Sequence, residues 1–293
     1  DALIRRRIKV YVVDDLSSGS LKNLNPNAHF TKLSIVSAQF VDYLKRLKPD
    51  VVFHCAAQIN LRTSFEDPQG DARVNIIGTI NLANGAGQCG VKKIVLCSSA
   101  GVYPQVDRFP ISEKVLAQPS SPYGISKRAA EMYLNYAYQI FGVPYVALRY
   151  ANVYGPRQNA KGEGGVITTF VSRMLKGEPV TIFGNGKNTR DFVYVDDVVR
   201  ANMLAMTRNV VGEFNIGTGR ETDVQTLFKK LSKLMGYTLP PRNAPLPAFD
   251  VARNSLDARR ARKFLGWEPQ VKLDDGLAKT VKWFSQTPSS TRG

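Results

Sequence analysis

The first half of this 293-residue chain alternates short apolar runs with amphipathic stretches, and no other feature limits the possible fold as strongly. Short runs rich in β-branched residues are typical of buried strands in a parallel sheet. The stretches between them carry apolar side chains three and four positions apart, which predicts helices. The pattern therefore predicts an α/β fold with a doubly wound parallel sheet. The predicted strands are residues 10–13, 51–54, 94–97 and 145–148, and the predicted helices are residues 38–47, 74–88 and 127–141.

Gly-, Pro- and Asn-rich stretches interrupt the second half of the chain at residues 155–165, 184–188 and 240–247. Such turn-forming residues predict shorter elements, and so a smaller α/β domain in addition to the sheet domain. We expect the sheet domain to hold residues 1–152 and 188–216, the smaller domain to hold residues 153–187 and 217–286, and residues 287–293 to form a disordered tail.

The chain carries 40 Lys and Arg residues against 24 Asp and Glu residues, which gives a formal net charge of +16. A basic surface attracts nucleic acid, but most of these residues are spread through helical stretches, as on solvated faces. We therefore predict no nucleic-acid partner. No apolar run is long enough to cross a membrane, and residues 1–7 lack the apolar core of a secretory signal, so we expect a cytoplasmic protein with no membrane partner.

The three cysteines, Cys55, Cys89 and Cys97, lie in apolar or strand-like stretches. Their spacing suggests neither a disulfide framework nor a zinc site. We therefore expect small buried hydrophobic residues, and no metal.

A dinucleotide-binding sheet usually opens with a strand, a Gly-rich turn and a helix whose N-terminus holds the pyrophosphate. Residues 1–7 look like the end of that helix, so we expect about twenty residues with the Gly-rich turn to precede Asp1. The strand 10–13 ends in Asp14-Asp15. An acidic side chain there accepts hydrogen bonds from ribose hydroxyls and favours NAD over NADP. In isolation Asp14 would more often be a turn residue, and the following Leu16–Ser20 segment makes the two interpretations about equal.

Three residues, Ser99, Tyr123 and Lys127, form a candidate catalytic group. The strand 94–97 is followed by Ser98 and Ser99, and a helix opening at Ser120–Lys127 places Tyr123 and Lys127 four positions apart, on one helix face. A Lys ammonium beside a Tyr favours the phenolate, which is a useful general base. Ser99 is placed to orient a substrate hydroxyl, and Lys127 to hold a ribose. By spacing alone, Tyr123 and Lys127 would more often be a surface pair.

At these residues the chain resembles the extended short-chain dehydrogenase/reductase family, whose fold is Rossmann-like. Further similar segments lie at residues 54–57, 75–79, 148–157 and 190–197, and segments at 162–167, 181–184 and 214–219 look most like those of the nucleotide-sugar 4-epimerases. The resemblance implies that residues 1–152 and 188–216 bind NAD and that residues 153–187 and 217–286 bind the substrate, a UDP-hexose. It implies a homodimer joined through the helices 74–88 and 127–141.

The resemblance also implies a role for each matching residue. The implied catalytic residues are Ser99, Tyr123 and Lys127. The implied NAD-binding residues are Asp14, Asp15, Ser17, Ser18, Gly19, Ser34, Ile35, Cys55, Ala56, Ala57, Gln58, Asn75, Ser98, Tyr123, Lys127 and Tyr150. The implied substrate-binding residues are Ser99, Tyr123, Asn152, Val166, Ile167, Thr181, Ile182, Phe183, Arg190 and Arg253. His54 reads instead as a residue packed or hydrogen-bonded within the sheet.

Two segments depart from the family pattern besides the missing Gly-rich turn. Leu33-Ser34-Ile35 stands where the family often has Gly-Asp-Ile, and Pro247–Asp250 stands where an Arg commonly contacts the second phosphate. Arg253 or Arg242 is the candidate replacement for that Arg.

The implied reaction is 4-epimerisation through a transient 4-keto sugar, on UDP-glucose and UDP-galactose or on their N-acetyl forms. A 4,6-dehydratase is the first alternative, but this chain has Ala100-Gly101 where dehydratases of the family carry an additional acid pair. A decarboxylase stays open. A non-catalytic nucleotide-binding or RNA-binding relative is a third alternative, which the retention of Ser99, Tyr123 and Lys127 disfavours.

Overall fold

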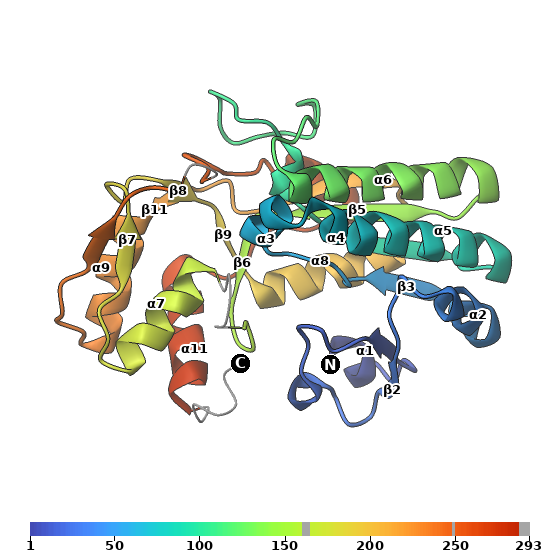
Figure 1. The fold of residues 1–293 in the computed structure, drawn as a ribbon, viewed down its shortest axis with the longest axis horizontal. Coiled ribbons are helices and arrows are strands. Elements are labelled where there is room, and N and C mark those ends of the chain that lie inside the picture. The colour runs from blue at the N-terminus through green and yellow to red at the C-terminus, as the bar shows by residue number, and fades with distance from the viewer. Residues whose placement is uncertain (160–164, 248–249, 287–293) are drawn as a thin grey trace. The chain divides into compact units, whose positions relative to one another are not determined.

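The computed structural model describes residues 1–159, 165–247 and 250–286, and its fold is α/β (Figure 1). Part of the Gly-rich segment 162–167, part of the segment 247–250 and the predicted tail 287–293 lie outside the described residues. The chain divides into two compact units. The first holds residues 1–102, 117–148 and 205–213, and the second holds residues 103–116, 149–204 and 214–293. The predicted assignment of NAD and substrate to two domains stays a prediction.

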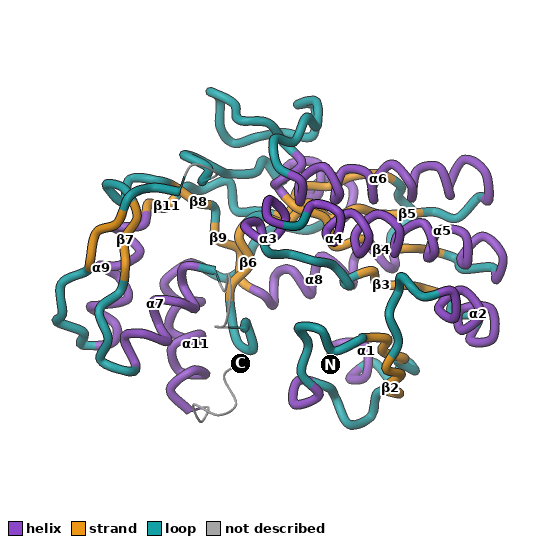
Figure 2. The backbone as a smooth tube through the Cα atoms, in the orientation of Figure 1, coloured by secondary structure: helices purple, strands orange, loops and turns teal. Residues whose placement is uncertain are grey.

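Helices and strands follow one another through the chain, and Figure 2 distinguishes the two by colour. Up to residue 102 they are α1 (Ala2–Arg5), β1 (Tyr11–Asp14), η1 (Leu21–Asn23), β2 (His29–Lys32), α2 (Ala38–Leu47), β3 (Val51–His54), α3 (Leu61–Glu66), α4 (Pro68–Ala72), η2 (Arg73–Ile77), α5 (Gly78–Cys89), β4 (Lys93–Ser99) and η3 (Ala100–Val102). After it come α6 (Pro122–Phe141), β5 (Tyr145–Tyr150), β6 (Asn152–Tyr154), α7 (Val166–Leu175), β7 (Thr181–Phe183), β8 (Thr189–Arg190), β9 (Phe192–Tyr194), α8 (Val195–Thr207), β10 (Gly212–Ile216), β11 (Thr222–Asp223), α9 (Val224–Met235), β12 (Arg242–Ala244), α10 (Arg259–Leu265) and α11 (Leu273–Gln286).

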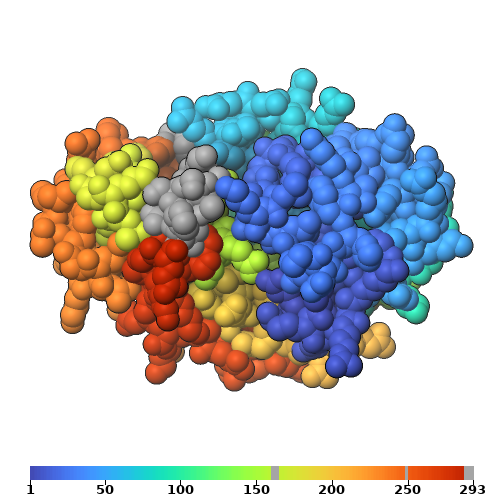
Figure 3. Space-filling view, turned by 90° about the horizontal axis from the view of Figure 1, so that it is seen from below, coloured from blue at the N-terminus to red at the C-terminus, as the bar shows by residue number. Residues whose placement is uncertain are grey.

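The first unit is built on parallel strands. One sheet has the strand order β10-β5-β4-β3, and β3 pairs with β4 in a register that sets His54 opposite Leu96. The pair β1-β2 is parallel too, and forms a sheet of its own in the described part of the chain. The segment that carries β1 and η1 is largely exposed, and Figure 3 shows it in dark blue at the surface.

A single apolar cluster holds helices α2, α5 and α6 against β4 and β5. Helix α5 lies between α2 and α6 in the row of helices that Figure 1 shows. The cluster contains Leu44, Leu82, Ile94, Leu134 and Ala147, all at most 3% exposed. Burying a Leu or Ile side chain contributes about 2 kcal/mol, so this cluster fixes the helices that follow β3 and β4.

The second unit is made of two-stranded sheets and helices. β6 pairs with β9 and β7 with β12 in parallel, and β8 pairs with β11 in antiparallel fashion. Helices α7, α9 and α11 enclose its apolar core, which includes Phe170, Leu227 and Phe284. Within the described residues, no helix is long and apolar enough to cross a bilayer.

The predicted strands and helices are confirmed, with shifted ends. β3 and α2 have the predicted bounds, whereas β4 extends to Ser99 and α6 begins at Pro122. The early start of α6 has a local cause: the Ser121 hydroxyl accepts from the Gly124 amide, and Pro122 occupies the first helical position, where its missing N–H costs nothing. Tyr123 therefore lies inside the helix that carries Lys127.

Candidate active site

Ser99 and Tyr123 lie on either side of Gly101. Ser99 ends β4, and its hydroxyl accepts a hydrogen bond from the Gly101 amide at 3.0 Å. A β-carbon on Gly101 would lie 3.3 Å from Ser99 Oγ and 3.6 Å from two ring carbons of Tyr123. The serine hydroxyl and the tyrosine ring therefore border the same small space, as the sequence predicts.

Close backbone packing sets this approach. A β-carbon on Gly124 would lie 2.2 Å from the carbonyl oxygen of Gly101 and 2.8 Å from the side chain of Pro119. Only glycine fits at that distance. The start of α6 is thereby pressed against η3, and Tyr123 is held beside the end of β4.

Burial dominates the electrostatics of Tyr123. Burial raises the pKa of the phenol to about 12. The hydrogen bond with Ser99 lowers this pKa, and the negative charge of the Asp71 carboxylate raises it further. The expectation that Lys127 lowers the pKa of Tyr123 below its ordinary value is therefore wrong for the protein without bound ligands. Lys127 is 4% exposed, and burial lowers the pKa of its ammonium, opposed by Cys97, Cys55, Glu131 and Asp71.

Asn75 connects the loop after β3 to α6. Its side-chain oxygen accepts from the Gln58 amide at 2.8 Å, and its amide group donates to the Gln58 carbonyl at 2.9 Å and to Ser126 Oγ at 3.0 Å. Asn75 is 2% exposed. Its side chain therefore positions the Cys55–Gln58 segment and does not itself project from the surface.

Asp71 is a member of this network that the sequence analysis missed. Its Oδ1 accepts from Gln58 at 2.8 Å and from Asn75 at 3.3 Å, while Oδ2 is buried without a partner in the described residues. Asp71 and Asn75 are four positions apart, and this helical spacing could have predicted that the two side chains lie side by side. The carboxylate places a negative charge near Tyr123 and Lys127.

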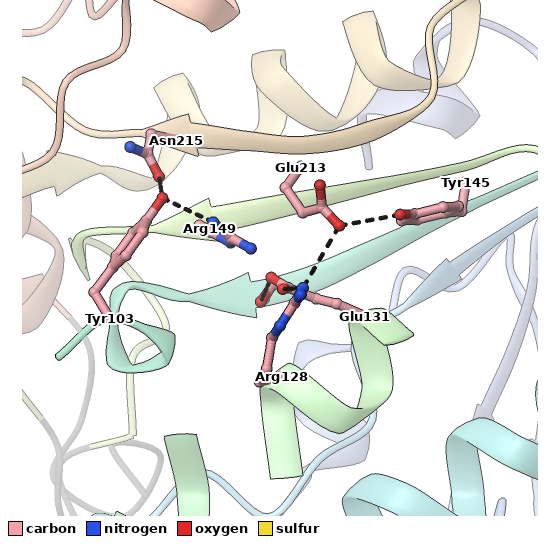
Figure 4. Close-up of polar contacts among 8 residues, drawn as sticks. Tyr103, Arg128, Glu131, Tyr145, Arg149, Glu213 and Asn215 are labelled. Atoms are coloured by element: carbon pink, nitrogen blue, oxygen red, sulfur yellow. Dashed lines mark hydrogen bonds and ion pairs between the residues drawn. The ribbon is translucent and has the colours of Figure 1, made fainter. Parts of the chain in front are cut away.

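Ser98 points away from the space shared by Ser99 and Tyr123. Its hydroxyl donates to Glu131 Oε1 at 2.7 Å, and Glu131 Oε2 accepts from Arg128 at 2.9 Å. Arg128 lies 3.8 Å from Glu213, which accepts from the Tyr145 hydroxyl (Figure 4). Ser98 therefore connects β4 to α6. This hydrogen bond favours a positioning role for Ser98 over the implied contact with the cofactor.

The loop after β1 forms an acidic turn. Asp14 Oδ1 accepts from the Leu16 amide, and Asp15 Oδ1 accepts from the Ser17 amide at 2.9 Å. A β-carbon on Gly19 would lie 2.9 Å from Asp14 Oδ1, so the turn closes on this carboxylate. Hydrogen bonds from Ser17 lower the pKa of Asp15. Asp15, Ser17, Ser18 and Gly19 are exposed.

Ile35 belongs to the core of the first unit. It is 8% exposed and packs against Gly78, and its carbonyl accepts from Asn81 at 2.9 Å. A hydrogen bond from Ser34 contributes to lowering the pKa of Asp15, which places Ser34 at the acidic turn.

His54 and the cysteines lie at the ends of β3 and β4. His54 is 5% exposed and lies 2.9 Å from Thr79 Oγ1, and burial together with Lys127 lowers its pKa to about 3, as fits a packed residue. The prediction of buried cysteines is wrong: Cys55 is exposed, and Cys89 and Cys97 are half-buried. The thiols of Cys55 and Cys97 are 3.2 Å apart.

In the second unit, Arg190 pairs with Asp250 and also donates to the carbonyls of Thr189 and Val251. The neighbouring carboxylate, Asp191, is fully buried and accepts hydrogen bonds from the backbone amides of Thr218, Gly219 and Leu256. The backbone N–H of Asn152 donates to the Asp191 carbonyl at 2.8 Å, so Asn152 lies beside the residue that follows Arg190.

Arg253 donates two hydrogen bonds to the Glu221 carboxylate, at 2.6 and 3.0 Å. Thr189, which precedes Arg190, binds the same carboxylate, so Arg253 lies near Arg190. Its guanidinium also lies over the Phe109 ring at 4.4 Å. Tyr150, an implied cofactor residue, lies in this unit and accepts from Asn202 at 2.7 Å.

The implied uridine residues separate by burial. Ile167 and Ile182 are 1% and 4% exposed and belong to the apolar core, whereas Val166 and Thr181 are half-buried and Phe183 is exposed. Of the implied substrate-binding residues in α7 and β7, only Val166, Thr181 and Phe183 therefore have side chains that are not buried in the core.

Comparison with known proteins finds relatives that are similar to nearly the whole chain. The model of the NAD-dependent epimerase/dehydratase family matches residues 1–217. The chain belongs to this family. It is 42% identical over 291 residues to a UDP-glucose 4-epimerase of Mycolicibacterium smegmatis, with 97% of this chain and 93% of that protein covered.

Two solved structures of family members are similar to the chain. The UDP-glucose 4-epimerase of Thermotoga maritima with UDP-glucose has a TM-score of 0.96 and 46% identity, with 98% of this chain and 94% of that chain covered. The UDP-glucose 4-epimerase of Thermus thermophilus in complex with NAD has a TM-score of 0.92 and 34% identity, with the same coverage.

The residues of the first unit fit the family's cofactor. A carboxylate at the end of β1, exposed hydroxyls at Ser17 and Ser18 and the ammonium of Lys127 are partners for ribose hydroxyls. Asp14 would hold the adenine ribose and Lys127 the nicotinamide ribose.

Proposed function

We propose that this member of the family is an NAD-dependent 4-epimerase of UDP-hexoses, acting on UDP-glucose and UDP-galactose or on their N-acetyl forms. One observation carries the proposal: Ser99, at the end of β4, and Tyr123, in α6, border the same space. Tyr123 shares its face of α6 with the buried Lys127. The near-full-length similarity to UDP-glucose 4-epimerases supports the substrate class.

The proposed chemistry assigns one task to each of these residues. Ser99 holds the C4 hydroxyl of the sugar, Tyr123 accepts its proton, and the Lys127 ammonium stabilises the phenolate that is needed. NAD would supply the reversible hydride chemistry at C4 when bound. Tyr123 would return its proton to the C4 oxygen when the sugar is reduced again on its opposite face.

For the substrate, we propose that Arg190 and Asn152 bind the diphosphate and that Val166, Thr181 and Phe183 border the uridine. A planar guanidinium suits phosphate oxygens. Arg190 is already bound to Asp250 and two carbonyls, so its fork is held in place before a ligand arrives. Arg253, anchored by Glu221, is the second candidate cation.

A 4,6-dehydratase is disfavoured by the residues after Ser99. That reaction needs an acid and a base at C5 and C6, whereas Ala100 and Gly101 follow Ser99 and form η3. Incubation with UDP-galactose and coupled detection of UDP-glucose separates the candidates, because a dehydratase would yield a 4-keto-6-deoxy sugar, whereas a decarboxylase needs a carboxylate at C6 and would form no UDP-glucose.

We also propose a homodimer formed through α5 and α6. Helix α6 leaves apolar side chains exposed at Ile125 (53%), Met132 (59%), Tyr136 (45%) and Ile140 (62%). Their spacing puts them on one helix face, and an apolar stripe of this kind is typical of helix–helix interfaces. Sedimentation should give a dimer that Met132→Glu/Ile140→Glu dissociates; a monomeric parent protein would contradict this.

The free thiols of the described residues agree with a cytoplasmic location, which we also propose.

A further inference from the structure

Two thiols meet at the edge of the sheet where the candidate active site lies. Cys55 follows β3 and Cys97 lies near the end of β4, and their sulfur atoms are 3.2 Å apart. The register sets His54 opposite Leu96, so the next residues in each strand, Cys55 and Cys97, face each other. Neighbouring strands run about 4.8 Å apart, which lies within the Cα separation that a disulfide spans.

The surroundings of the pair connect it to catalysis. Cys97 comes two residues before Ser99, and Cys55 begins the Cys55–Gln58 segment that Asn75 holds in place. Both thiols lie close enough to Lys127 to affect the pKa of its ammonium. The residue Cys55 is exposed as a whole while its sulfur atom is buried, so access of a small oxidant to the sulfur is restricted.

We propose that Cys55 and Cys97 form an oxidation site, at which a peroxide converts the two thiols reversibly into a disulfide that blocks the cofactor segment. One sulfur attacks the peroxide, the O–O bond breaks, and a sulfenic acid forms while hydroxide leaves. The second sulfur attacks the sulfenic sulfur, an S–S bond forms, and water leaves. The pair loses two electrons and two protons, and hydrogen peroxide becomes two waters. A thiol reductant reverses the change by exchange.

The reaction is expected to be slow at neutral pH. The hydrogen bond with Cys97, together with burial of the sulfur, raises the pKa of the Cys55 thiol, and the thiolate is the attacking form. The site therefore responds to sustained oxidation, and mildly alkaline conditions accelerate its reaction.

The test maps thiols directly. The protein, Cys55→Ser, Cys97→Ser and the matched control Cys89→Ser are treated with hydrogen peroxide at mildly alkaline pH, alkylated and analysed by mass spectrometry. The free thiols of the parent protein should fall from three to one, with Cys55 and Cys97 in one linked peptide, and dithiothreitol should restore all three. Cys89→Ser should form the same link, whereas Cys55→Ser and Cys97→Ser should not. Alkylation of both Cys55 and Cys97 after treatment, or a link involving Cys89, overturns the proposal.

A second arm tests the blocking of the cofactor segment, which rests on the proposed function. NAD present during oxidation should slow formation of the link, and the oxidised protein should bind NAD at least tenfold more weakly until it is reduced. A link that forms equally fast with NAD, in a protein that still binds NAD, overturns the blocking and leaves the oxidation site itself established. Absence of NAD binding in either state, also by the chain preceded by a Gly-rich strand–turn–helix segment, contradicts the proposed function instead.

Discussion

The hydroxyl of Ser98 donates a hydrogen bond to the carboxylate of Glu131 at 2.7 Å, which ties β4 to α6. The neighbour of Ser98 is Ser99, and Glu131 lies one helical turn beyond Lys127. Because Glu131 is fully buried and also pairs with Arg128, this contact sets the position of α6, which carries Tyr123 and Lys127, against β4, which ends at Ser99 (Figure 4).

Replacing Glu131 should therefore change both stability and the pH profile. Glu131→Ala leaves the Ser98 and Arg128 groups without a buried partner and should cost about 3 kcal/mol of unfolding free energy. Glu131→Gln keeps an acceptor for Ser98 but removes a charge that raises the pKa of Lys127, so the pH profile of kcat should shift. Denaturant unfolding and kcat against pH measure the two effects.

The matched control is Glu213→Gln, which removes the other carboxylate beside Arg128. It should lower stability slightly and leave the pH profile of kcat in place. Equal profiles for Glu131→Gln and the parent protein would show that Glu131 has a structural role only.

Gly124→Ala tests the packing that places Tyr123. The new β-carbon would lie 2.2 Å from the Gly101 carbonyl oxygen, so α6 or η3 must move. We expect a loss of about 1–3 kcal/mol in stability, together with a fall in kcat larger than any change in KM. Thermal unfolding and steady-state kinetics check this, and unchanged kcat in a folded variant would contradict the geometry.

His54 should make stability pH-dependent. Its folded-state pKa of about 3 lies below the ordinary value of 6.5, so its contribution is complete above pH 6.5 and is lost as the pH falls towards 3. One proton gives a slope of about 1.4 kcal/mol per pH unit in this window. His54→Gln should remove that part of the slope in urea unfolding.

His29, the other histidine of the chain, supplies the control, because it is exposed and stacks on Tyr11. His29→Gln should retain the slope. A slope unchanged in His54→Gln would mean that other groups carry the acid dependence.

Arg190→Lys should raise KM for UDP-galactose about tenfold or more and affect kcat less, because an ammonium cannot replace the planar fork. Arg253→Lys is the comparison, since Arg253 is held by Glu221 near the same site. A larger KM effect for Arg253 than for Arg190 would assign the principal phosphate contact to Arg253.

The sequence predicts best what local patterns control. The periodicity of residues 38–47 and the run at 51–54 predict α2 and β3, and the four-residue spacing of Tyr123 and Lys127 places them on one helix face. Contacts between distant segments leave no such pattern. The Cys55–Cys97 contact depends on the register of two strands, and Arg190 meets Asp250 across 60 residues. Burial of Tyr123 depends on the whole unit, so the direction of its pKa shift could not be predicted from Lys127 alone.

The most direct test of the account is epimerisation of UDP-galactose by this chain, by the chain preceded by a Gly-rich strand–turn–helix segment, and by the Tyr123→Phe variant of each, with NAD present. UDP-N-acetylgalactosamine serves as the second substrate. We predict UDP-glucose formation that Tyr123→Phe lowers by about 10²- to 10⁴-fold while NAD binding is kept, since only the phenolic proton acceptor is removed. If both parent proteins bind NAD but turn over neither sugar nucleotide, or if Tyr123→Phe is fully active, the proposed epimerase mechanism is wrong.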